Sequence, residues 1–469
     1  MWRSGRTALE SRTVPEQTQR WDAEQVLALA PDASSQRAGR SLGSAARWRE
    51  TGRWSPETGA GGPLALWGLC QGSGSKPYQT AVDLTEPAYH CSCPSRKFPC
   101  KHALALMLLW SGGSVAAGEP PEWVTQWLRG REDRRQRAAA RTPRPVGGTD
   151  RAPSRSSQRR AERVDAGVEE LDRWLGDQVR QGLAGATRAG YAHWDTMAAR
   201  LVDAQAPGLA SSVRRLASAA SSPDRLLTEL ALIRLLVSGY RRIGTLPDDL
   251  AASVRSRVGF PVATDDVLAG PRVRDVWAVV AASESVDERL TVRRCWLRGT
   301  ATGRPALVLT FVAPGQSVPA DLVLGTAVDA DLCFYPGAMP LRAIVAVRHS
   351  PPTRYPAPPD AVTICAALDS YADALAREPW LDRWPVVLAG VTPVPSGGVS
   401  SDGSAGVAGG GRWYLRDEAG DALPVEPGGG PPWRLVAAAG GRPVTVAGEW
   451  APAGLRPLTA WVDDRLVVL

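Results

Sequence analysis

The chain has 469 residues, a net charge of +7 and a hydrophobic fraction of 44%, which suits about three domains of roughly 150 residues, each with its own core. No run of about 18 apolar residues is present, and the start MWRSGRTALE lacks the apolar core of a signal peptide, so we expect a cytoplasmic protein with no membrane partner. Seven cysteines, three of them within ten positions of each other, exclude a secreted disulfide framework and favour a metal site.

Residues 1–63 are predicted to be a helical lead-in, with helical patterns at Asp22–Ala30 and Ser34–Arg47. An apolar run at Leu64–Cys70 and an alternating segment at Tyr78–Leu84 follow, and the glycine-rich stretch between them predicts the turn of a β-hairpin. This hairpin leads directly into the clustered cysteines, so residues 64–111 are predicted to form one small domain.

The clustered residues follow the pattern C-x-C, six residues, C-x-H, formed by Cys91, Cys93, Cys100 and His102. Residues two apart on an extended strand point to one face, so the first two cysteines can reach one ion. Residues two apart on a helix diverge by about 200°, so Cys100 is expected just before the helix predicted by the apolar run Ala103–Trp110, and His102 in its first turn. Three thiolates and one imidazole fill the four positions of tetrahedral zinc and leave none for a catalytic water. The sequence therefore predicts one structural Zn²⁺ ion.

Cations flank these ligands. Three thiolates, a neutral imidazole and Zn²⁺ together keep one negative charge, which Arg96, Lys97 and Lys101 can balance. The same three side chains are the candidate contacts to nucleic acid. Two other interpretations of the cluster stay open: free cysteines packed as small hydrophobes, and an iron–sulfur cluster, which usually takes four thiolates.

The ligand pattern, with the strands before it and the helix after it, resembles the SWIM zinc finger over roughly Leu64–Trp110, about a tenth of the chain. Only the four ligands are carried over from this resemblance. Such fingers occur in transposases, chromatin-remodelling ATPases, recombination factors and a ubiquitin-ligase kinase, which implies binding of DNA or protein. The order of predicted domains also resembles bacterial SWIM-finger proteins of unassigned activity, and no functional residue follows from that looser likeness.

Residues 112–160 are predicted to be an arginine-rich linker. From Arg129 to Arg163 there are twelve arginines against four acids, so the basic excess is concentrated here and the remaining chain is close to neutral. A helix is expected to begin near Glu122, and prolines and glycines indicate no fixed structure over Ala138–Gln158. The segment is equally typical of a solvated tether and of an electrostatic arm for DNA.

Residues 161–245 are predicted to be a helical domain, because apolar residues recur at helical spacing in Val164–Val179, Trp194–Leu201, Leu209–Leu216 and Leu226–Val237. Residues 265–469 are predicted to be a β-rich domain, with short β-type runs at Ala306–Val312, Leu341–Val347, Pro385–Val394 and Val444–Val446. The glycine- and serine-rich stretch Ser396–Gly411 is expected to be a flexible loop.

The other histidines and cysteines receive structural interpretations; they are His90, Cys70, His193, His349, Cys295, Cys333 and Cys365. His90 would face the side of its strand opposite to the neighbouring ligands. Gly68–Lys76 is interpreted as a hairpin turn and not as a phosphate-binding loop, because no helix begins there. The chain has no H-E-x-x-H, G-x-S-x-G or Walker sequence.

The sequence therefore indicates an α+β protein with a small N-terminal ββα zinc finger, a helical middle domain and a β-rich C-terminal domain. We expect a binding or adaptor module and not an enzyme. A protein is the expected partner, and DNA is a second possibility through Arg96, Lys97, Lys101 and the arginine-rich linker. An enzyme with an unrecognised site in the C-terminal domain is the alternative.

Overall fold

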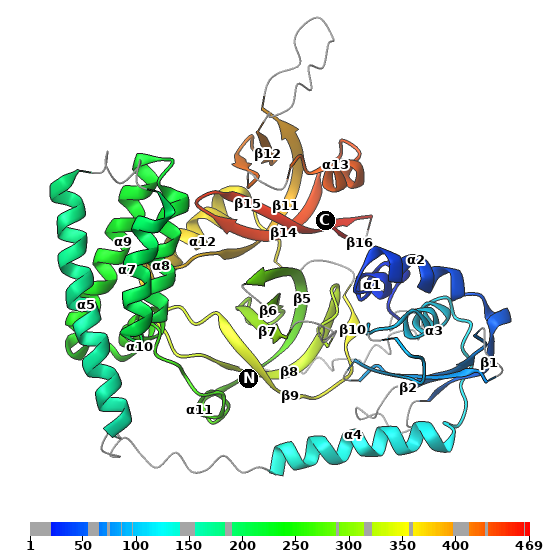
Figure 1. The fold of residues 1–469 in the computed structure, drawn as a ribbon. Coiled ribbons are helices and arrows are strands. Elements are labelled where there is room, and N and C mark those ends of the chain that lie inside the picture. The colour runs from blue at the N-terminus through cyan, green and yellow to red at the C-terminus, as the bar shows by residue number, and fades with distance from the viewer. Residues whose placement is uncertain are drawn as a thin grey trace, which may run out of the picture.

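The computed structural model (Figure 1) describes residues 20–54, 65–72, 76–85, 87–95, 97–140, 155–182, 190–287, 290–313, 321–355, 360–396, 412–426, 430–463 and 465–469. Residues 141–154 of the predicted unstructured segment Ala138–Gln158, and all of the predicted loop Ser396–Gly411 except Ser396, lie outside these ranges. Helix α4 (Glu122–Ala140) ends later, and helix α5 (Arg155–Gln181) begins earlier, than the predicted unstructured segment Ala138–Gln158 allows. That prediction is wrong at its borders because Ala138–Ala140, at the end of α4, and Arg155 and Gln158, at the start of α5, are good helix formers.

The N-terminal region combines helices with one antiparallel sheet of order β1-β2-β3-β4. Its elements are α1 (Ala23–Ala28), α2 (Ala33–Leu42), β1 (Trp48–Trp54), β2 (Ala65–Cys70), β3 (Tyr78–Asp83), β4 (Ala88–Cys91) and α3 (Lys101–Ser111). The predicted hairpin is confirmed, since β2 and β3 pair with Leu66 opposite Val82.

Strand β1 lies inside the lead-in that the sequence predicted to be helical. It has a bulge between Arg49 and Gly52, which breaks the alternation that would have revealed a strand. A side chain at Gly52 would overlap the ring of Trp67 on β2, so the close pairing of these strands requires glycine there.

The middle of the chain is a helical bundle with its own buried core. Its helices are α5, α7 (Tyr191–Asp203), α8 (Pro207–Ala219), α9 (Pro223–Arg241) and α10 (Asp248–Val258), followed by the short α11 (Thr264–Leu268). The four segments predicted to be helical lie within α5, α7, α8 and α9, so these predictions are confirmed. Helix α10 lies beyond the predicted helical domain, which ends at residue 245, because its few apolar positions give a weak helical pattern.

The next strands form a closed barrel. They are β5 (Arg272–Asp287), β6 (Leu290–Gly299), β7 (Pro305–Val312), β8 (Thr326–Phe334) and β9 (Arg342–Arg348), with the two-residue β10 (Thr353–Arg354) added along β8. The order around the barrel is β5-β6-β7-β9-β8, and β8 pairs back onto β5. Strands β7 and β9 are parallel, whereas the other neighbours are antiparallel.

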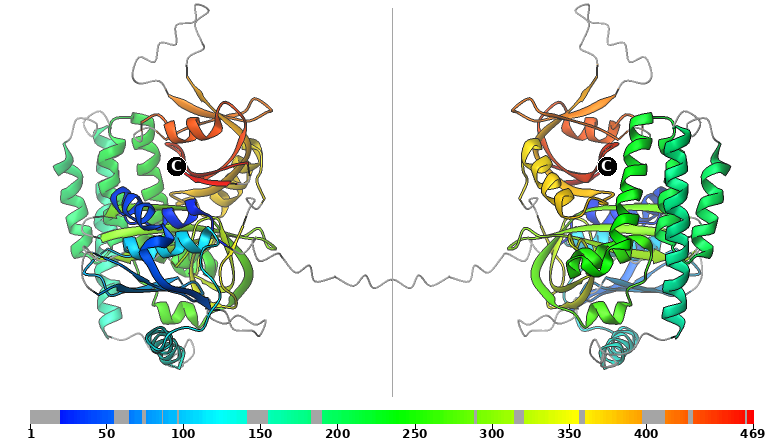
Figure 2. Two further views of the ribbon diagram at one scale, coloured as in Figure 1. Left: turned by 90° about the vertical axis from the view of Figure 1, so that its right-hand side faces the viewer. Right: turned by 90° about the vertical axis from the view of Figure 1, so that its left-hand side faces the viewer.

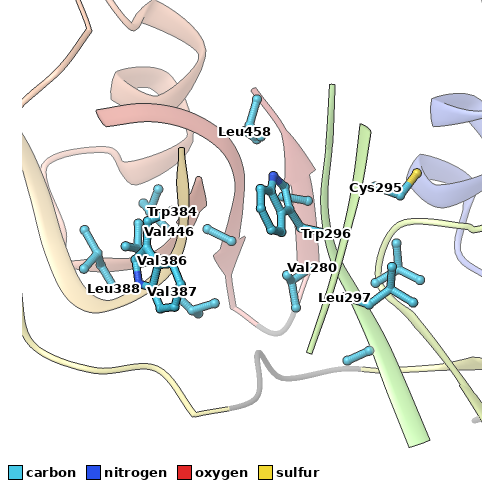
Figure 3. Close-up of a cluster of buried hydrophobic side chains, with 14 of the residues drawn as sticks. Val280, Cys295, Trp296, Leu297, Trp384, Val386, Val387, Leu388, Val446 and Leu458 are labelled. Carbon is cyan, nitrogen blue, oxygen red and sulfur yellow. The ribbon is translucent and has the colours of Figure 1, made fainter. Parts of the chain in front are cut away.

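A C-terminal sheet of order β13-β12-β11-β14-β15-β16 packs against this barrel. Its strands are β11 (Trp384–Pro395), β12 (Trp413–Arg416), β13 (Ala422–Pro424), β14 (Val444–Ala451), β15 (Gly454–Val462) and β16 (Arg465–Val468), with helices α12 (Ile364–Arg377) and α13 (Trp433–Ala439). One hydrophobic core joins sheet and barrel. Figure 3 shows Trp296 of β6 pointing toward the C-terminal sheet, while Cys295 and Leu297 point to the other side of the strand.

The N-terminal region and the bundle lie on different sides of the barrel in Figure 1, and the C-terminal sheet lies above it in both views of Figure 2. The buried amide of Gln25 in α1 donates hydrogen bonds to the carbonyl oxygens of Leu324 (3.1 Å) and Gly325 (2.8 Å) beside β8. Among the described residues, no helix has the length and apolar character needed to cross a membrane. The mixture of helices and strands confirms the α+β class.

Candidate metal centre

Backbone geometry brings the four predicted ligands together. Cys91 is the last residue of β4, and Cys93 follows in the loop. Cys100 is the N-cap of α3, with extended backbone angles, and His102 lies in the first turn of that helix. The predicted positions of Cys100 and His102 relative to the helix are therefore confirmed.

The four donor atoms form a compact cluster, in which all of them lie within 4.8 Å of one another. The sulfur of Cys91 is 3.6 Å from Nδ1 of His102. Zinc with ligands at about 2.0–2.3 Å in a tetrahedral arrangement requires donor atoms to be roughly 3.5–3.8 Å apart. The donor set and its spacing therefore fit a zinc ion.

Neighbouring side chains orient these donors. The hydroxyl of Thr80 lies 3.3 Å from the sulfur of Cys91, and the ring of Tyr78 packs on the ring of His102 with 4.9 Å between centroids. Both residues come from β3, which pairs with β4 so that Thr80 is opposite Cys91. The alternation of β3 predicts that these two side chains share one face, but no sequence pattern indicates that this face meets the metal ligands.

Without a bound cation, the three cysteines together favour one thiolate and two neutral thiols. Hydrogen bonding with Cys100, helped by His102 and Thr80, lowers the pKa of Cys91 despite its partial burial. The same contact with Cys91, together with burial, raises the pKa of Cys100, and burial raises the pKa of Cys93. A divalent ion bound by thiolates offsets this repulsion, so zinc binding and deprotonation of the second and third thiols are coupled.

His90 and Cys70 lie beside the cluster without joining it. The ring of His90 is on the other face of β4, with its centroid 6.2 Å from that of Trp123 and 5.9 Å from that of Trp127 on α4. Cys70 is fully buried in the core under α3, where burial raises its pKa. Both residues have the structural surroundings predicted for them.

The comparisons with known proteins agree with this geometry. Residues 79–110 match the family model of the SWIM zinc finger. These residues are a SWIM zinc finger. Residues 159–258 match the model of the SWIM-associated four-helix bundle domain, so the bundle that follows the SWIM finger is also of a recognised type. No curated protein and no solved structure matches the chain.

The three cations predicted to contact nucleic acid have different surroundings. Arg96 lies outside the described residues. Lys97 is exposed, but its ammonium group forms an ion pair of 2.6 Å with Asp32, the N-cap of α2. Lys101 is exposed at the start of α3, where it lines a cavity of about 590 Å³ beside the SWIM finger together with Arg47. The structure thus gives Lys101 a position suited to balancing the charge of the cluster.

The remaining histidines and cysteines lie in separate places. His193 contacts Gln178 (3.0 Å) inside the bundle, and His349 contacts Asp331 (2.9 Å) at the barrel. Cys295 and Cys333 are buried in the barrel, and Cys365 is exposed on α12. Among the described residues, the four ligands form the group of histidine, cysteine and acidic side chains close enough to hold a metal.

Proposed function

We propose that the chain is a cytoplasmic, zinc-dependent binding module that recognises a protein partner and carries out no catalysis. The main support for this proposal is the Cys₃His cluster, whose four side chains would occupy all four tetrahedral positions around one zinc ion. Such an ion would have a structural role, because no position is left for a catalytic water. Without the metal, the C-terminal end of β4 and the N-terminal end of α3 are no longer held together. The surface of the SWIM finger that binds the partner therefore depends on zinc.

A protein partner is favoured by the charges around the SWIM finger. Lys97 pairs with Asp32, and Arg131 of α4 pairs with Asp83 of β3 at 3.1 Å. Side chains held by carboxylates of the same chain are less available to phosphates. This leaves a surface of mixed charge, which suits protein contacts better than a nucleic-acid backbone.

Affinity purification from cells of the source organism tests this function. The intact chain and Cys365→Ser are expected to retain the same protein partner, because Cys365 is exposed on α12, far from the cluster in the sequence. Cys93→Ser and chelator-treated protein are expected to lose it. Retention of the same partner by Cys93→Ser would contradict a zinc-dependent surface.

DNA is a second candidate because α4 is a continuous helix with five arginines against three acids. Such a helix can lie along the phosphates of a duplex and would bind with little sequence preference. The test is a titration of duplex DNA at about 50 and about 200 mM salt. An arm variant with Arg134, Arg135 and Arg137 changed to Gln should bind more weakly and with a flatter salt dependence. No binding by the intact chain at the lower salt rejects this candidate.

A further inference from the structure

A second site lies where the bundle meets the barrel, remote from the SWIM finger in the sequence. A cavity of about 380 Å³ has walls from α8, α10, β6, β7 and the loop between β8 and β9. Cavities of this size at domain junctions are common places for ligands.

The barrel contributes one continuous sheet face to this cavity. Arg294 and Trp296 of β6 stand opposite Leu309 and Leu307 of β7, and Leu307 pairs with Arg342 of β9. All of these side chains line the cavity. These side chains belong to the outer face of the barrel. In Figure 3, Trp296 points toward the C-terminal sheet, which packs on the outside of the barrel, while its neighbours along β6, Cys295 and Leu297, point the other way.

Positive charge converges on the cavity from both domains. Five arginines line it: Arg215 of α8, Arg257 of α10, Arg294, Arg342 and Arg383. The carboxylates among the lining residues are Glu378 and Asp382, and Arg257 already forms ion pairs with both, at 3.1 and 2.8 Å. Arg215 also lies 3.8 Å from Asp382, and two carboxylates behind the lining pair with the other arginines: Glu449 with Arg294 and Arg383, and Glu426 with Arg383. Five arginines therefore meet four carboxylates, and the positive charge left over, on Arg342, attracts anions.

Two of these arginines keep donors available. The Nε of Arg294 donates a hydrogen bond of 3.1 Å to the buried carboxylate of Glu449. The two terminal nitrogens of Arg294 have no acceptor within the described part of the chain. Arg342 has no acidic partner among the described residues. Its guanidinium lies 4.1 Å from the ring centroid of Tyr335 and 5.9 Å from that of Phe311. An arginine held by aromatic rings is well placed to contact phosphates.

An exposed aromatic side chain adjoins the arginines. Phe311 follows Leu307 and Leu309 on the same face of β7, and 53% of its surface is exposed. A large apolar ring exposed beside guanidinium groups that keep donors available is the combination on which bases stack while phosphates are neutralised.

The topology of the barrel supports the same ligand. Five strands in the order β5-β6-β7-β9-β8, with β7 parallel to β9, have the connectivity of the OB-type barrel. Barrels of that type bind oligonucleotides on the face of their second and third strands and on the loop between the fourth and fifth. In this chain those elements are β6, β7 and residues 335–341, which line the cavity.

We propose that this outer face binds single-stranded nucleic acid, with Arg294 and Arg342 contacting phosphates and Phe311 stacking on a base. The site is distinct from the zinc-dependent surface proposed above. The fold alone would not assign a function to this face. The assignment rests on the basic cavity, which lies on the same face that binds ligands in barrels of this type.

Fluorescence anisotropy with the full chain tests the proposal. The probe is a fluorescein-labelled oligothymidylate of about 12 nucleotides, titrated at about 50 and about 200 mM salt. Phe311→Ala should weaken binding about tenfold through the lost stacking. Arg342→Gln should weaken it several-fold and reduce the log–log salt slope by about 0.7, the value for one phosphate contact with a single strand.

Matched controls separate the site from general effects. Trp433→Ala removes an equally exposed aromatic ring on α13, and Arg416→Gln removes an exposed arginine on β12; both should bind like the intact chain. Ser211 and Ser218 are exposed serines of α8, and the first of them lines the cavity. Ser211→Asp should therefore weaken binding, and Ser218→Asp should not.

Four outcomes would overturn the proposal. One is the absence of saturable binding at the lower salt. The second is equal affinity of Phe311→Ala and the intact chain, and the third is equally tight binding of a duplex of the same length. The fourth is loss of binding in the arm variant of α4 while the barrel variants bind normally, which would assign the oligonucleotide to the arginine-rich helix.

Discussion

At the scale of single residues, the four ligands differ in what holds them. Cys91, Cys100 and His102 belong to a strand end, a helix cap and a helix turn, whereas Cys93 lies in the connecting loop and is half-buried. Replacing Cys93 therefore removes a ligand without removing a residue of a strand or helix, so it reports on the metal itself.

Purified intact protein is expected to contain one zinc ion per chain, and Cys93→Ser about none, because three ligands hold zinc far more weakly than four. Elemental analysis by mass spectrometry measures the content. Cys365→Ser, an exposed cysteine on α12, should keep the full content. Two ions per chain, or none in the intact protein, would refute a single structural site.

At the scale of elements, α8 and α10 pack so closely that the contact leaves no room for a side chain at Gly208. Gly208 lies in the first turn of α8, and a methyl group there would overlap the carbonyl oxygen of Arg257 near the end of α10. The oxygen belongs to the backbone of α10, and the methyl group would be fixed directly on the backbone of α8, so the helices would have to move apart.

Gly208→Ala is accordingly expected to destabilise the bundle by about 2 kcal/mol through overpacking. Gly176→Ala in α5 is the control, because its methyl group would meet only the flexible side chain of Arg180 and alanine favours the helix. That variant should be unchanged or up to about 1 kcal/mol more stable. Calorimetric unfolding compares them, and equal stability of both variants would contradict the close packing.

The same scale shows what the sequence could predict. Period-3.6 and period-2 patterns predicted α5, α7, α8, α9 and the hairpin β2–β3 because each pattern is local. The C-x-C and C-x-H spacings also encode local geometry, so the ligand cluster could be predicted. The bulged β1 and the closure of the barrel could not. Gly52 is explained only by the ring of Trp67 across the sheet, and the barrel closes through strands that are not consecutive in the chain, β5 with β8 and β7 with β9. The arginines of the cavity come from five segments and leave no motif.

At the scale of the whole molecule, Glu378 connects the bundle to the β-rich region. Its buried carboxylate accepts hydrogen bonds from the hydroxyl of Ser253 (2.9 Å), the Nε of Arg257 (3.2 Å) and the backbone N–H of Met339 (3.3 Å). These donors belong to α10 and to the loop after β8. A carboxylate with such partners fixes the relative position of the two units.

Glu378→Gln should lower the free energy of unfolding by about 3 kcal/mol, because Arg257 loses a buried charged partner. The loss should appear as separate melting of the bundle and the β-rich region in calorimetry. Glu418→Gln, at an exposed turn, is the control and should melt like the intact chain. A single unshifted transition in Glu378→Gln would mean that other contacts hold the units together.

The SWIM finger is also joined to the barrel, through the lead-in helix α1. Trp21 and Val26 pack in the core that includes α3, and the same core contains Val323 of the segment before β8. Between these residues, the amide of Gln25 is bonded to the carbonyl oxygens that follow Val323. Loosening of α3 should therefore reach the barrel through α1, whereas the bundle has a separate core.

Removal of zinc by a chelator is expected to increase hydrogen exchange over residues 65–111, because metal binding and folding of the finger are one equilibrium. A smaller increase is expected at residues 321–326, where α1 is attached, and none over residues 159–258, because local unfolding spreads only through shared contacts. Hydrogen-exchange mass spectrometry of the intact chain, with and without chelator, measures all three regions together. Gln25→Leu should remove the effect at residues 321–326, since it deletes the two hydrogen bonds that connect them to α1. Faster exchange in the bundle after chelation would show instead that the whole molecule unfolds as one cooperative unit.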